Sequence, residues 1–213
     1  MILPRTCLIV AANRTHASQI LALVSARRTA GLYPREIEFE VISDPDRGRI
    51  GSGGATLRAA IAAQPRLERG EPVLVIHAGG ESRRMPTYAP EGKLCAPLPL
   101  PSSSPIPPIV LDLHLSLFLR FPWKRGELLV TSGDVAIDFD TDLIPDDRGD
   151  VYGFAAPASI ELGSHHGVFK FDRSKVRVVD YFQKESVQFL TEHAALEGSR
   201  ACAVDLGIIG TGA

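Results

Sequence analysis

The chain has 213 residues, of which 45% are hydrophobic and 23% are charged, a composition typical of an ordinary folded domain. This composition excludes a disordered chain, a collagen and a small disulfide scaffold. The 23 lysines and arginines are balanced by 25 acidic residues, so the formal net charge is −2. Because a nucleic-acid-binding protein normally carries a basic excess, we expect no nucleic-acid partner.

The cysteines, Cys7, Cys95 and Cys202, are scattered along the sequence and match no zinc-site spacing. Isolated thiols are typical of a reducing compartment, so we expect a cytoplasmic protein whose cysteines are buried as small apolar residues. The stretch 94–119 is strongly apolar, but its prolines argue against a regular spanning helix. We therefore expect no membrane segment.

Short apolar runs alternate with helical patterns in the first two thirds of the sequence. The runs predicted as buried strands are 7–12, 39–42, 73–77 and 128–131. The predicted helices run from the cap residue Asn13 to the stop signal Gly31, over 55–63 with Pro65 as the end, and over 109–121. This alternation indicates βαβ units and a mainly parallel sheet.

The last third of the sequence has a different pattern. Strand-like segments are predicted near 151–156, 167–171, 175–182 and 203–209, so we expect β-rich structure added to the α/β core. Within the α/β part of the sequence, the stretch 86–108 holds eight of the 16 prolines and is predicted to be a long functional loop, a lid or a wall. The sequence stops just after an apolar strand, so we expect a piece of a longer protein.

The strand predicted over 73–77 leads into a glycine turn that suits a phosphate. Ala78, Gly79 and Gly80 let backbone N–H groups approach an anion without interference from side chains. Arg83, Arg84 and Lys93 follow, and three cations near such a turn are what a triphosphate needs. A structural turn with solvated arginines is the alternative, and composition does not decide between the two.

Two further features favour an anion or metal site. Asp134 stands at the carboxyl end of a predicted strand, where a lone carboxylate suits Mg²⁺; capping of the next segment is the alternative. The flexible turn formed by Gly51, Ser52, Gly53 and Gly54 precedes a helix whose N-terminus could bind an anion.

Three segments together carry a family resemblance: Gly51-Ser-Gly-Gly-Ala-Thr56, His77-Ala-Gly-Gly-Glu-Ser-Arg-Arg-Met-Pro86 and Tyr88-Ala-Pro-Glu-Gly-Lys93. They resemble the L-fucose-1-phosphate guanylyltransferases, or GDP-fucose pyrophosphorylases, which occur alone or fused to fucokinase. Further matches lie at 132–134, 165–169, 182–184 and 205–207. The resemblance implies transfer of a guanylyl group from GTP to L-fucose 1-phosphate, with release of pyrophosphate.

The resemblance also implies the architecture. We expect an α/β fold with a Rossmann-like, mixed but mainly parallel sheet of the nucleotide-diphospho-sugar transferase (GT-A-like) type, and a β-rich C-terminal third. Residues 1–213 would form a single nucleotidyltransferase domain of a longer protein, with covalent fusion to further domains beyond residue 213. In related enzymes a glycine turn that contacts the base follows the Ala-Gly-Gly loop, whereas here it precedes that loop. This departure predicts a reordered topology.

Residue roles follow from the same resemblance. Arg84 would hold the β- and γ-phosphates with help from Arg83, Lys93 would stabilise charge at the α-phosphate and leaving group, and Asp134 would bind Mg²⁺. The nucleotide-binding residues would be Gly51, Ser52, Gly53, Gly54, Ala78, Gly79, Gly80 and Arg83. His166, Lys184 and Asp205 would bind the sugar phosphate, with Asp205 at the start of a strand.

Three other functions remain as alternatives. One is a nucleotidyltransferase for another sugar 1-phosphate or another nucleoside triphosphate, because guanine and fucose rest on resemblance. Another is a non-catalytic module that binds nucleotide sugars, which would not require Arg84, Lys93 and Asp134 together. The last is a dinucleotide-binding oxidoreductase domain, against which no G-x-G-x-x-G follows the first predicted strand.

Overall fold

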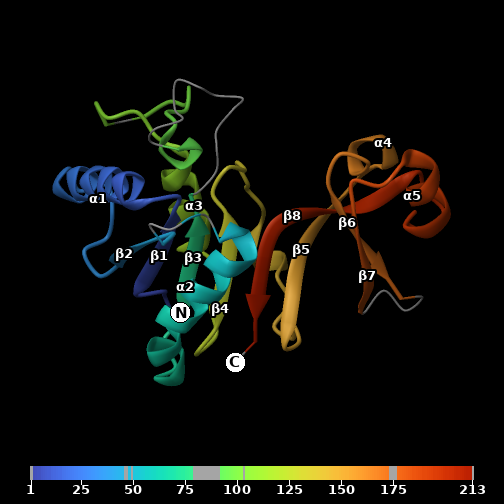
Figure 1. The fold of residues 1–213 in the computed structure, drawn as a ribbon, viewed down its shortest axis with the longest axis horizontal. Helices are drawn as coiled ribbons and strands as arrows, with labels where there is room; N and C mark the ends of the chain where they lie inside the picture. The colour runs from blue at the N-terminus through green and yellow to red at the C-terminus, as the bar shows by residue number, and fades with distance from the viewer. Residues whose placement is uncertain are drawn as a thin grey trace. The chain divides into compact units, whose positions relative to one another are not determined.

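The computed structural model describes residues 2–45, 48, 50–78, 92–102, 104–172 and 177–212. The chain divides into two compact units. Unit 1 consists of Met1–Tyr152 and Ile209–Ala213, and unit 2 of Gly153–Ile208. Figure 1 shows most of unit 1 in blue to yellow, its C-terminal residues in red, and unit 2 in orange to red. The fold is mixed α/β, as the sequence predicts.

Four parallel strands form the centre of unit 1. They are β1 (Thr6–Ala11), β2 (Glu38–Ser43), β3 (Val73–His77) and β4 (Leu128–Ser132), arranged in the order β2-β1-β3-β4. Each neighbouring pair is parallel, with Cys7 opposite Phe39 on β2 and Leu74 on β3. These strands confirm the predicted parallel sheet, and β3 has the predicted bounds.

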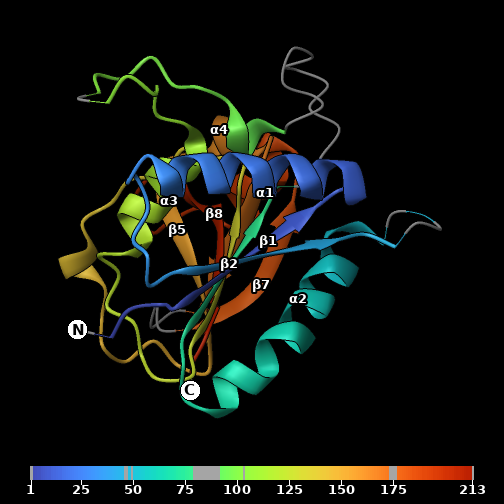
Figure 2. The same cartoon turned by 90° about the vertical axis from the view of Figure 1, so that its left-hand side faces the viewer.

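The helices of unit 1 cover this sheet. They are α1 (Arg14–Thr29), α2 (Gly51–Glu68) and α3 (Val110–Phe118), with short 3₁₀ turns η2 (Lys93–Cys95) and η3 (Thr141–Leu143). On one face, the alanines of α2 pack against Leu8, Val10, Val73 and Val75. On the other side α1 and α3 lie together (Figure 2), and an ion pair of 2.6 Å joins Arg27 of α1 to Asp112 of α3.

Helix α1 starts and stops as the sequence predicts. The side chain of Asn13 accepts the N–H of His16 at 2.9 Å, and Gly31 beyond the helix has φ +73°. Helix α2 differs, because it begins at Gly51 and continues beyond Pro65 to Glu68. The proline removes one hydrogen bond, but Leu67 beyond it packs on the same apolar cluster as the alanines. Burial of Leu67 thus favours a further turn, and the prediction that Pro65 ends the helix is wrong.

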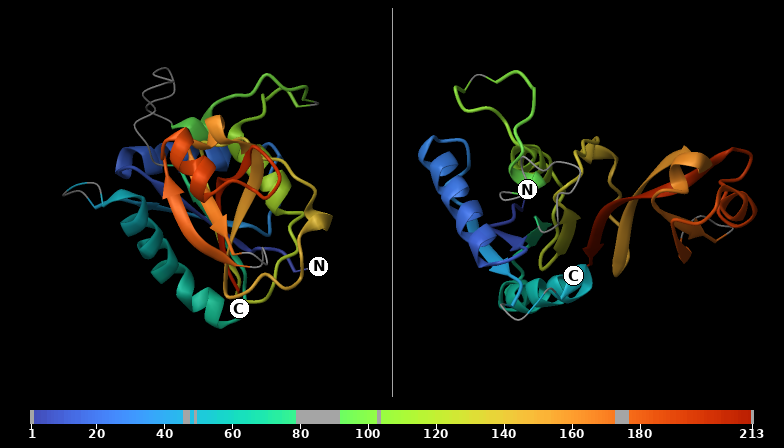
Figure 3. Two further views of the ribbon diagram at one scale, coloured as in Figure 1. Left: turned by 90° about the vertical axis from the view of Figure 1, so that its right-hand side faces the viewer. Right: turned by 45° about the horizontal axis from the view of Figure 1, so that its top comes forward.

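Unit 2 contains an antiparallel sheet. Strand β6 (Gly167–Phe171) pairs with β7 (Val178–Gln183) on one side and with β8 (Ala201–Thr211) on the other. The strand β5 (Val151–Ser159) leads into this unit, which also holds the short helices α4 (Ile160–Gly163) and α5 (Val187–His193) (Figure 3). The β-rich last third is therefore confirmed, whereas the two short helices are an addition to it.

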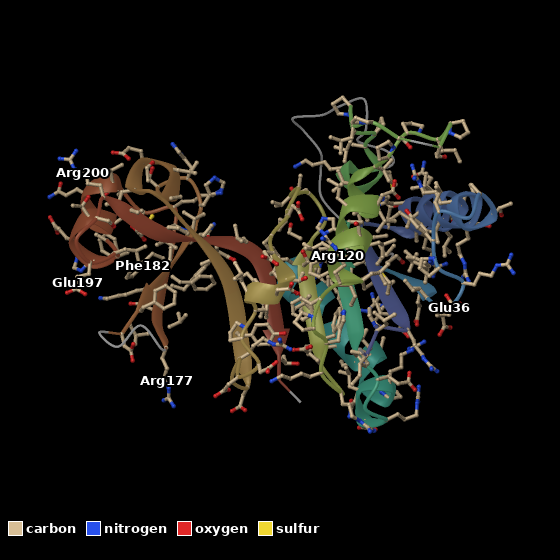
Figure 4. All side chains as sticks on the ribbon, turned by 180° about the vertical axis from the view of Figure 1, so that it is seen from behind. Glu36, Arg120, Arg177, Phe182, Glu197 and Arg200 are labelled. Carbon is tan, nitrogen blue, oxygen red and sulfur yellow. The ribbon has the colours of Figure 1, made fainter. Side chains whose placement is uncertain are left out.

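One face of the unit 2 sheet is covered. Val168, Phe182 and Val204 pack into a cluster with Ile160 of α4 and Leu190 of α5. Phe182, labelled in Figure 4, makes an edge-to-face contact with the ring of Phe189, with the ring centroids 5.1 Å apart. The residues that alternate with these three therefore lie on the opposite face of the sheet.

Two expectations need correction. Asp205 stands in the middle of β8 and not at the start of a strand, because the strand extends from Ala201 to Thr211. Cys7 and Cys202 are buried as expected, but Cys95, in the short turn η2, is only half-buried. Among the described residues, no helix combines the length and the apolar character that crossing a membrane requires.

Candidate functional site

A pocket of about 310 Å³ opens in unit 1 at the carboxyl ends of β1, β3 and β4. Its lining residues are Val10, Ala11, Ala12, Asp44, Gly51, Ser52, Ala55, His77, Ser132 and Asp134. Strand β1 has β2 as its neighbour on one side and β3 on the other, so the chain changes direction across the sheet at β1. Open α/β sheets bind ligands in the crevice at such a switch point. A second hollow, of about 440 Å³, shares Ala12 and Asp44 with this pocket.

Two of the predicted catalytic side chains meet at this edge of the sheet. Nζ of Lys93 donates to Oδ2 of Asp134 at 2.8 Å, and the hydroxyl of Ser132 donates to Oδ1 at 2.7 Å. Burial raises the pKa of the Asp134 carboxyl, but hydrogen bonds from Lys93 and Ser132 outweigh it, so the pKa is lowered overall. The carboxyl group is therefore ionised at neutral pH and remains 47% exposed to solvent.

Two glycines allow Lys93 and Asp134 to come together. Gly92 has φ +77°, and a Cβ there would lie 2.7 Å from Nε2 of His16. A Cβ at Gly133 would lie 2.6 Å from the carbonyl oxygen of His77. A larger residue at Gly133 would push the backbone away from β3, and one at Gly92 would clash with the ring of His16 in a backbone conformation that favours glycine. The glycines of the Gly-Lys and Ser-Gly-Asp motifs thus allow the backbone conformation that brings Lys93 and Asp134 into contact.

The wall of the pocket contains a hydrogen-bonded pair that the sequence analysis did not assign. Oγ1 of Thr56 on α2 lies 2.8 Å from Nε2 of His77 at the end of β3. Burial lowers the pKa of His77, although the nearby carboxylate of Asp44 opposes this shift. The sequence did carry one indication of His77, because this residue ends a predicted buried strand and directly precedes the glycine turn.

The glycine segment 51–54 forms the first turn of α2, four residues earlier than predicted. Gly51 and Ser52 line the pocket, and the N-cap residue Ile50 provides no side-chain cap. The free N–H groups of a first helical turn favour an anion. Ala78 is buried, and its N–H donates to the carbonyl of Val10 at 2.9 Å. The predicted residues Gly79, Gly80, Arg83 and Arg84 lie outside the described residues.

The predicted sugar-phosphate residues lie in unit 2. The N–H of Lys184, which has φ +57°, donates to the carbonyl of His166 at 3.0 Å. Both side chains are exposed. His166 directly precedes β6 and Lys184 directly follows β7, while Asp205 stands on β8, the other neighbour of β6. The structure therefore places these three residues on or next to three paired strands, and the hydroxyl of Tyr181 on β7 donates to Asp205 at 3.0 Å.

Among the described residues, a metal ion could bind only single carboxylates together with ligands from another molecule. In the described ranges, no three His, Cys, Asp or Glu side chains gather closely enough to hold an ion by themselves. Mg²⁺ retains several waters and commonly takes one or two carboxylates together with phosphate oxygens. The exposed, ionised carboxylate of Asp134 fits that donor set, provided that a nucleotide supplies the other oxygens.

Comparison with known proteins identifies relatives. Residues 69–211 match the family model described as the fucose pyrophosphorylase domain. An L-fucokinase/L-fucose-1-P guanylyltransferase from Bacteroides fragilis is 31% identical over 182 residues, which cover 78% of this chain and 19% of the relative. The bifunctional fucokinase/GDP-fucose pyrophosphorylase of Arabidopsis thaliana is 30% identical over 207 residues, covering 79% of this chain and 19% of the relative.

A human relative carries a single activity in its name. The fucose-1-phosphate guanylyltransferase of Homo sapiens is 33% identical over 159 residues, which cover 70% of this chain and 26% of that protein. The chain thus spans about a fifth to a quarter of the length of these curated relatives.

Proposed function

Because the chain belongs to the fucose pyrophosphorylase family, we propose that it transfers a guanylyl group from GTP to L-fucose 1-phosphate and releases pyrophosphate. The observation that carries this proposal is the meeting of Lys93 and Asp134 beside a pocket at the carboxyl edge of a parallel sheet. A cation and a carboxylate at that position suit a metal-bound triphosphate.

The nucleotide would occupy the pocket between β1, β3 and the first turn of α2. The backbone N–H groups at Gly51 and Ser52 and the glycine turn after His77 would contact its anionic or base groups. The sheet order of unit 1 supports a Rossmann-like arrangement, and we extend this to the GT-A-like type as part of the proposal. The isolated thiols favour a cytoplasmic location.

The reaction requires positioning and charge neutralisation more than covalent chemistry. A phosphate oxygen of the sugar 1-phosphate attacks the α-phosphorus of GTP in line, and the bond from that phosphorus to the bridging oxygen breaks. Lys93 stabilises the charge that develops on the α-phosphate and on the departing pyrophosphate. Arg84 would hold the β- and γ-phosphates, and Arg83 would assist.

Mg²⁺ would be held by Asp134 and by phosphate oxygens. When bound, the ion neutralises charge on the triphosphate and its leaving group. In this structure the ammonium group of Lys93 donates to the Asp134 carboxylate. It therefore has to turn toward the phosphates when the nucleotide binds. His166, Lys184 and Asp205 would bind the sugar phosphate.

A nucleotide titration combined with a product assay tests the proposal. Binding of GTP, ATP, UTP and CTP is measured with Mg²⁺, followed by pyrophosphate release with several sugar 1-phosphates. We expect release with GTP and L-fucose 1-phosphate to exceed every other combination. Preference for another pair would change the substrate. Nucleotide binding without release by the natural full-length protein would indicate a binding module.

A further inference from the structure

The open face of the unit 2 sheet has a notch in its central strand. Gly167 begins β6, and its register partner on β7 is Gln183. On the other side of β6, Val168 pairs with Val204, which brings Asp205 beside Gly167. A Cβ at Gly167 would overlap the phenol oxygen of Tyr181. The missing side chain therefore leaves the space that the phenol occupies.

Tyr181 uses this space to reach across the central strand. Its phenol oxygen lies 3.0 Å from Oδ2 of Asp205 and 2.9 Å from Oε1 of Gln183. One O–H can donate to only one of them, and a carboxylate is the stronger acceptor. The amide of Gln183 can then turn so that its N–H donates to the phenol oxygen. The result is a chain from Gln183 through Tyr181 to Asp205.

The other oxygen of Asp205 is also held. The N–H of Gly207, which has φ +69°, donates to Oδ1 at 2.7 Å. Each carboxylate oxygen therefore accepts a hydrogen bond from a described residue of unit 2, and a carboxylate oxygen has a second lone pair for a further donor. Asp205 is only half-buried, so part of the residue remains accessible to a ligand. A carboxylate fixed in this way is an oriented acceptor for hydroxyl donors.

Aromatic rings border this acceptor. The ring centroids of Tyr181 and Phe169 lie 5.3 Å apart on the same face of the sheet. Burial, together with the charge and hydrogen bond of Asp205, raises the pKa of Tyr181 to about 12, so the phenol keeps its proton at neutral pH. An aromatic surface beside an oriented carboxylate matches a sugar, which has both an apolar C–H edge and hydroxyl donors.

We propose that Tyr181 is a positioning residue, which holds Asp205 in the orientation that accepts hydroxyl groups of the sugar. This inference rests on the proposed function, because it assigns the sugar of that reaction to the open face of the unit 2 sheet. Gly167 makes the arrangement possible, because it leaves room for the phenol. A side chain at this position would therefore affect sugar binding indirectly.

The test compares KM for the sugar 1-phosphate with KM for GTP in the full-length protein. Tyr181→Phe keeps the ring and removes the hydroxyl, so we expect KM for the sugar phosphate to rise roughly tenfold, the effect of losing one hydrogen bond to a charged group. KM for GTP should stay unchanged. Gly167→Ala should displace the phenol and have the same effect. In an Asp205→Asn background, Tyr181→Phe should add little.

Tyr33→Phe is the matched control. The hydroxyl of Tyr33 donates to Asp112 at 2.7 Å in unit 1, so its loss also removes a tyrosine–carboxylate bond, but KM for the sugar phosphate should not change. If Gly167→Ala fails to fold, Tyr181→Phe still decides the matter. An unchanged KM in folded, active Tyr181→Phe would overturn the inference and leave the proposed function intact.

A wild-type protein that releases no pyrophosphate with any sugar 1-phosphate would instead contradict the proposed function. Calorimetric titration with L-fucose 1-phosphate then tests the inference separately. Weaker binding to Tyr181→Phe than to wild type would support the inference. Equal binding to both proteins, or no binding to either, would overturn it.

Discussion

The ammonium nitrogen of Lys93 lies 2.8 Å from a carboxylate oxygen of Asp134, although the two residues are 41 positions apart in the chain. The Lys93 side chain is 29% exposed and that of Asp134 is 47% exposed, and exposed ion pairs contribute only about 0–1 kcal/mol to stability. Stability alone therefore gives little reason for the pair. Its position beside the pocket favours a role in binding a metal and an anion.

Replacement of Lys93 tests its role at the phosphates. We expect Lys93→Ala to lower guanylyl transfer at least roughly a hundredfold, because one oriented transition-state contact is lost. Thermal unfolding should be nearly unchanged. Arg120→Ala is a suitable control, since Arg120 (labelled in Figure 4) is 59% exposed and pairs with the exposed Asp138 at 3.5 Å. Wild-type turnover of Lys93→Ala would disprove the assignment.

Arg84 follows the glycine turn, its contact with the β- and γ-phosphates is implied by the resemblance, and it lies outside the described residues. We expect Arg84→Ala to lower transfer by a similar factor, roughly a hundredfold or more, because its contact with the β- and γ-phosphates would be lost. Turnover and thermal unfolding are measured in the same way as for Lys93→Ala. Full activity of the variant would remove Arg84 from the site.

Asp134→Asn tests the proposed metal ligand. The amide keeps the shape of the side chain but lacks its charge, so we expect slower transfer and a higher Mg²⁺ concentration for half-maximal rate. Asp138→Asn, at a side chain 86% exposed, should leave the Mg²⁺ dependence unchanged. The two dependences are compared by titrating Mg²⁺ at fixed GTP. Identical curves for Asp134→Asn and wild type would place the metal elsewhere.

The sequence predicted the strands of the parallel sheet well, because β1, β3 and β4 are largely apolar runs bounded by turn residues, whereas β2 also contains Glu38 and Glu40. Strands β3 and β6 have the predicted bounds. Helix α4 has only four residues, too few for a periodic pattern to emerge. Helix α5 did carry a signal, since the side chain of Ser186 caps it by accepting the N–H of Phe189 at 3.1 Å.

The candidate site was predictable in part. The motifs pointed to Lys93 and Asp134, and the structure brings them together. The contacts of Thr56 with His77 and of Tyr181 with Asp205 were not predictable, because they depend on how a helix docks on a sheet and on strand register. A one-residue shift in register would move Tyr181 to the other face.

His114 gives a prediction about acid stability. This side chain on α3 is 2% exposed, and burial lowers its pKa to about 4, against smaller opposing effects of the Val135 backbone and Asp134. The unfolded chain binds a proton near pH 6.5, whereas the folded chain does so only near pH 4. His114 therefore does not change the free energy of unfolding above pH 6.5. Between pH 6.5 and 4 it lowers this free energy as the pH falls, by at most about 1.4 kcal/mol per pH unit.

Chemical unfolding of wild type and His114→Phe across this pH range measures the effect. The pH slope of the unfolding free energy should be smaller in the variant, because the titrating group is gone. His193→Gln, at a ring that is 46% exposed, should keep most of the wild-type slope. Equal slopes for wild type and His114→Phe would show that other groups cause the acid sensitivity.

The last prediction concerns a buried ion pair in unit 1. The Arg148 and Glu127 side chains are 3% and 0% exposed, and they lie 2.8 Å apart. Glu127 also accepts the Tyr152 hydroxyl at 2.6 Å and the N–H of Lys124 at 2.9 Å. The guanidinium group lies over the ring of Phe121, 5.1 Å from its centroid.

Removing one partner leaves the other charge buried and unpaired, so we expect Glu127→Leu or Arg148→Met alone to lower the free energy of unfolding by about 3–5 kcal/mol. The double variant should lose less than the sum of the two, because it leaves neither charge behind. Denaturant unfolding of all four proteins gives this coupling. Additive losses would show that the two residues stabilise unit 1 independently, through packing and not through their charges.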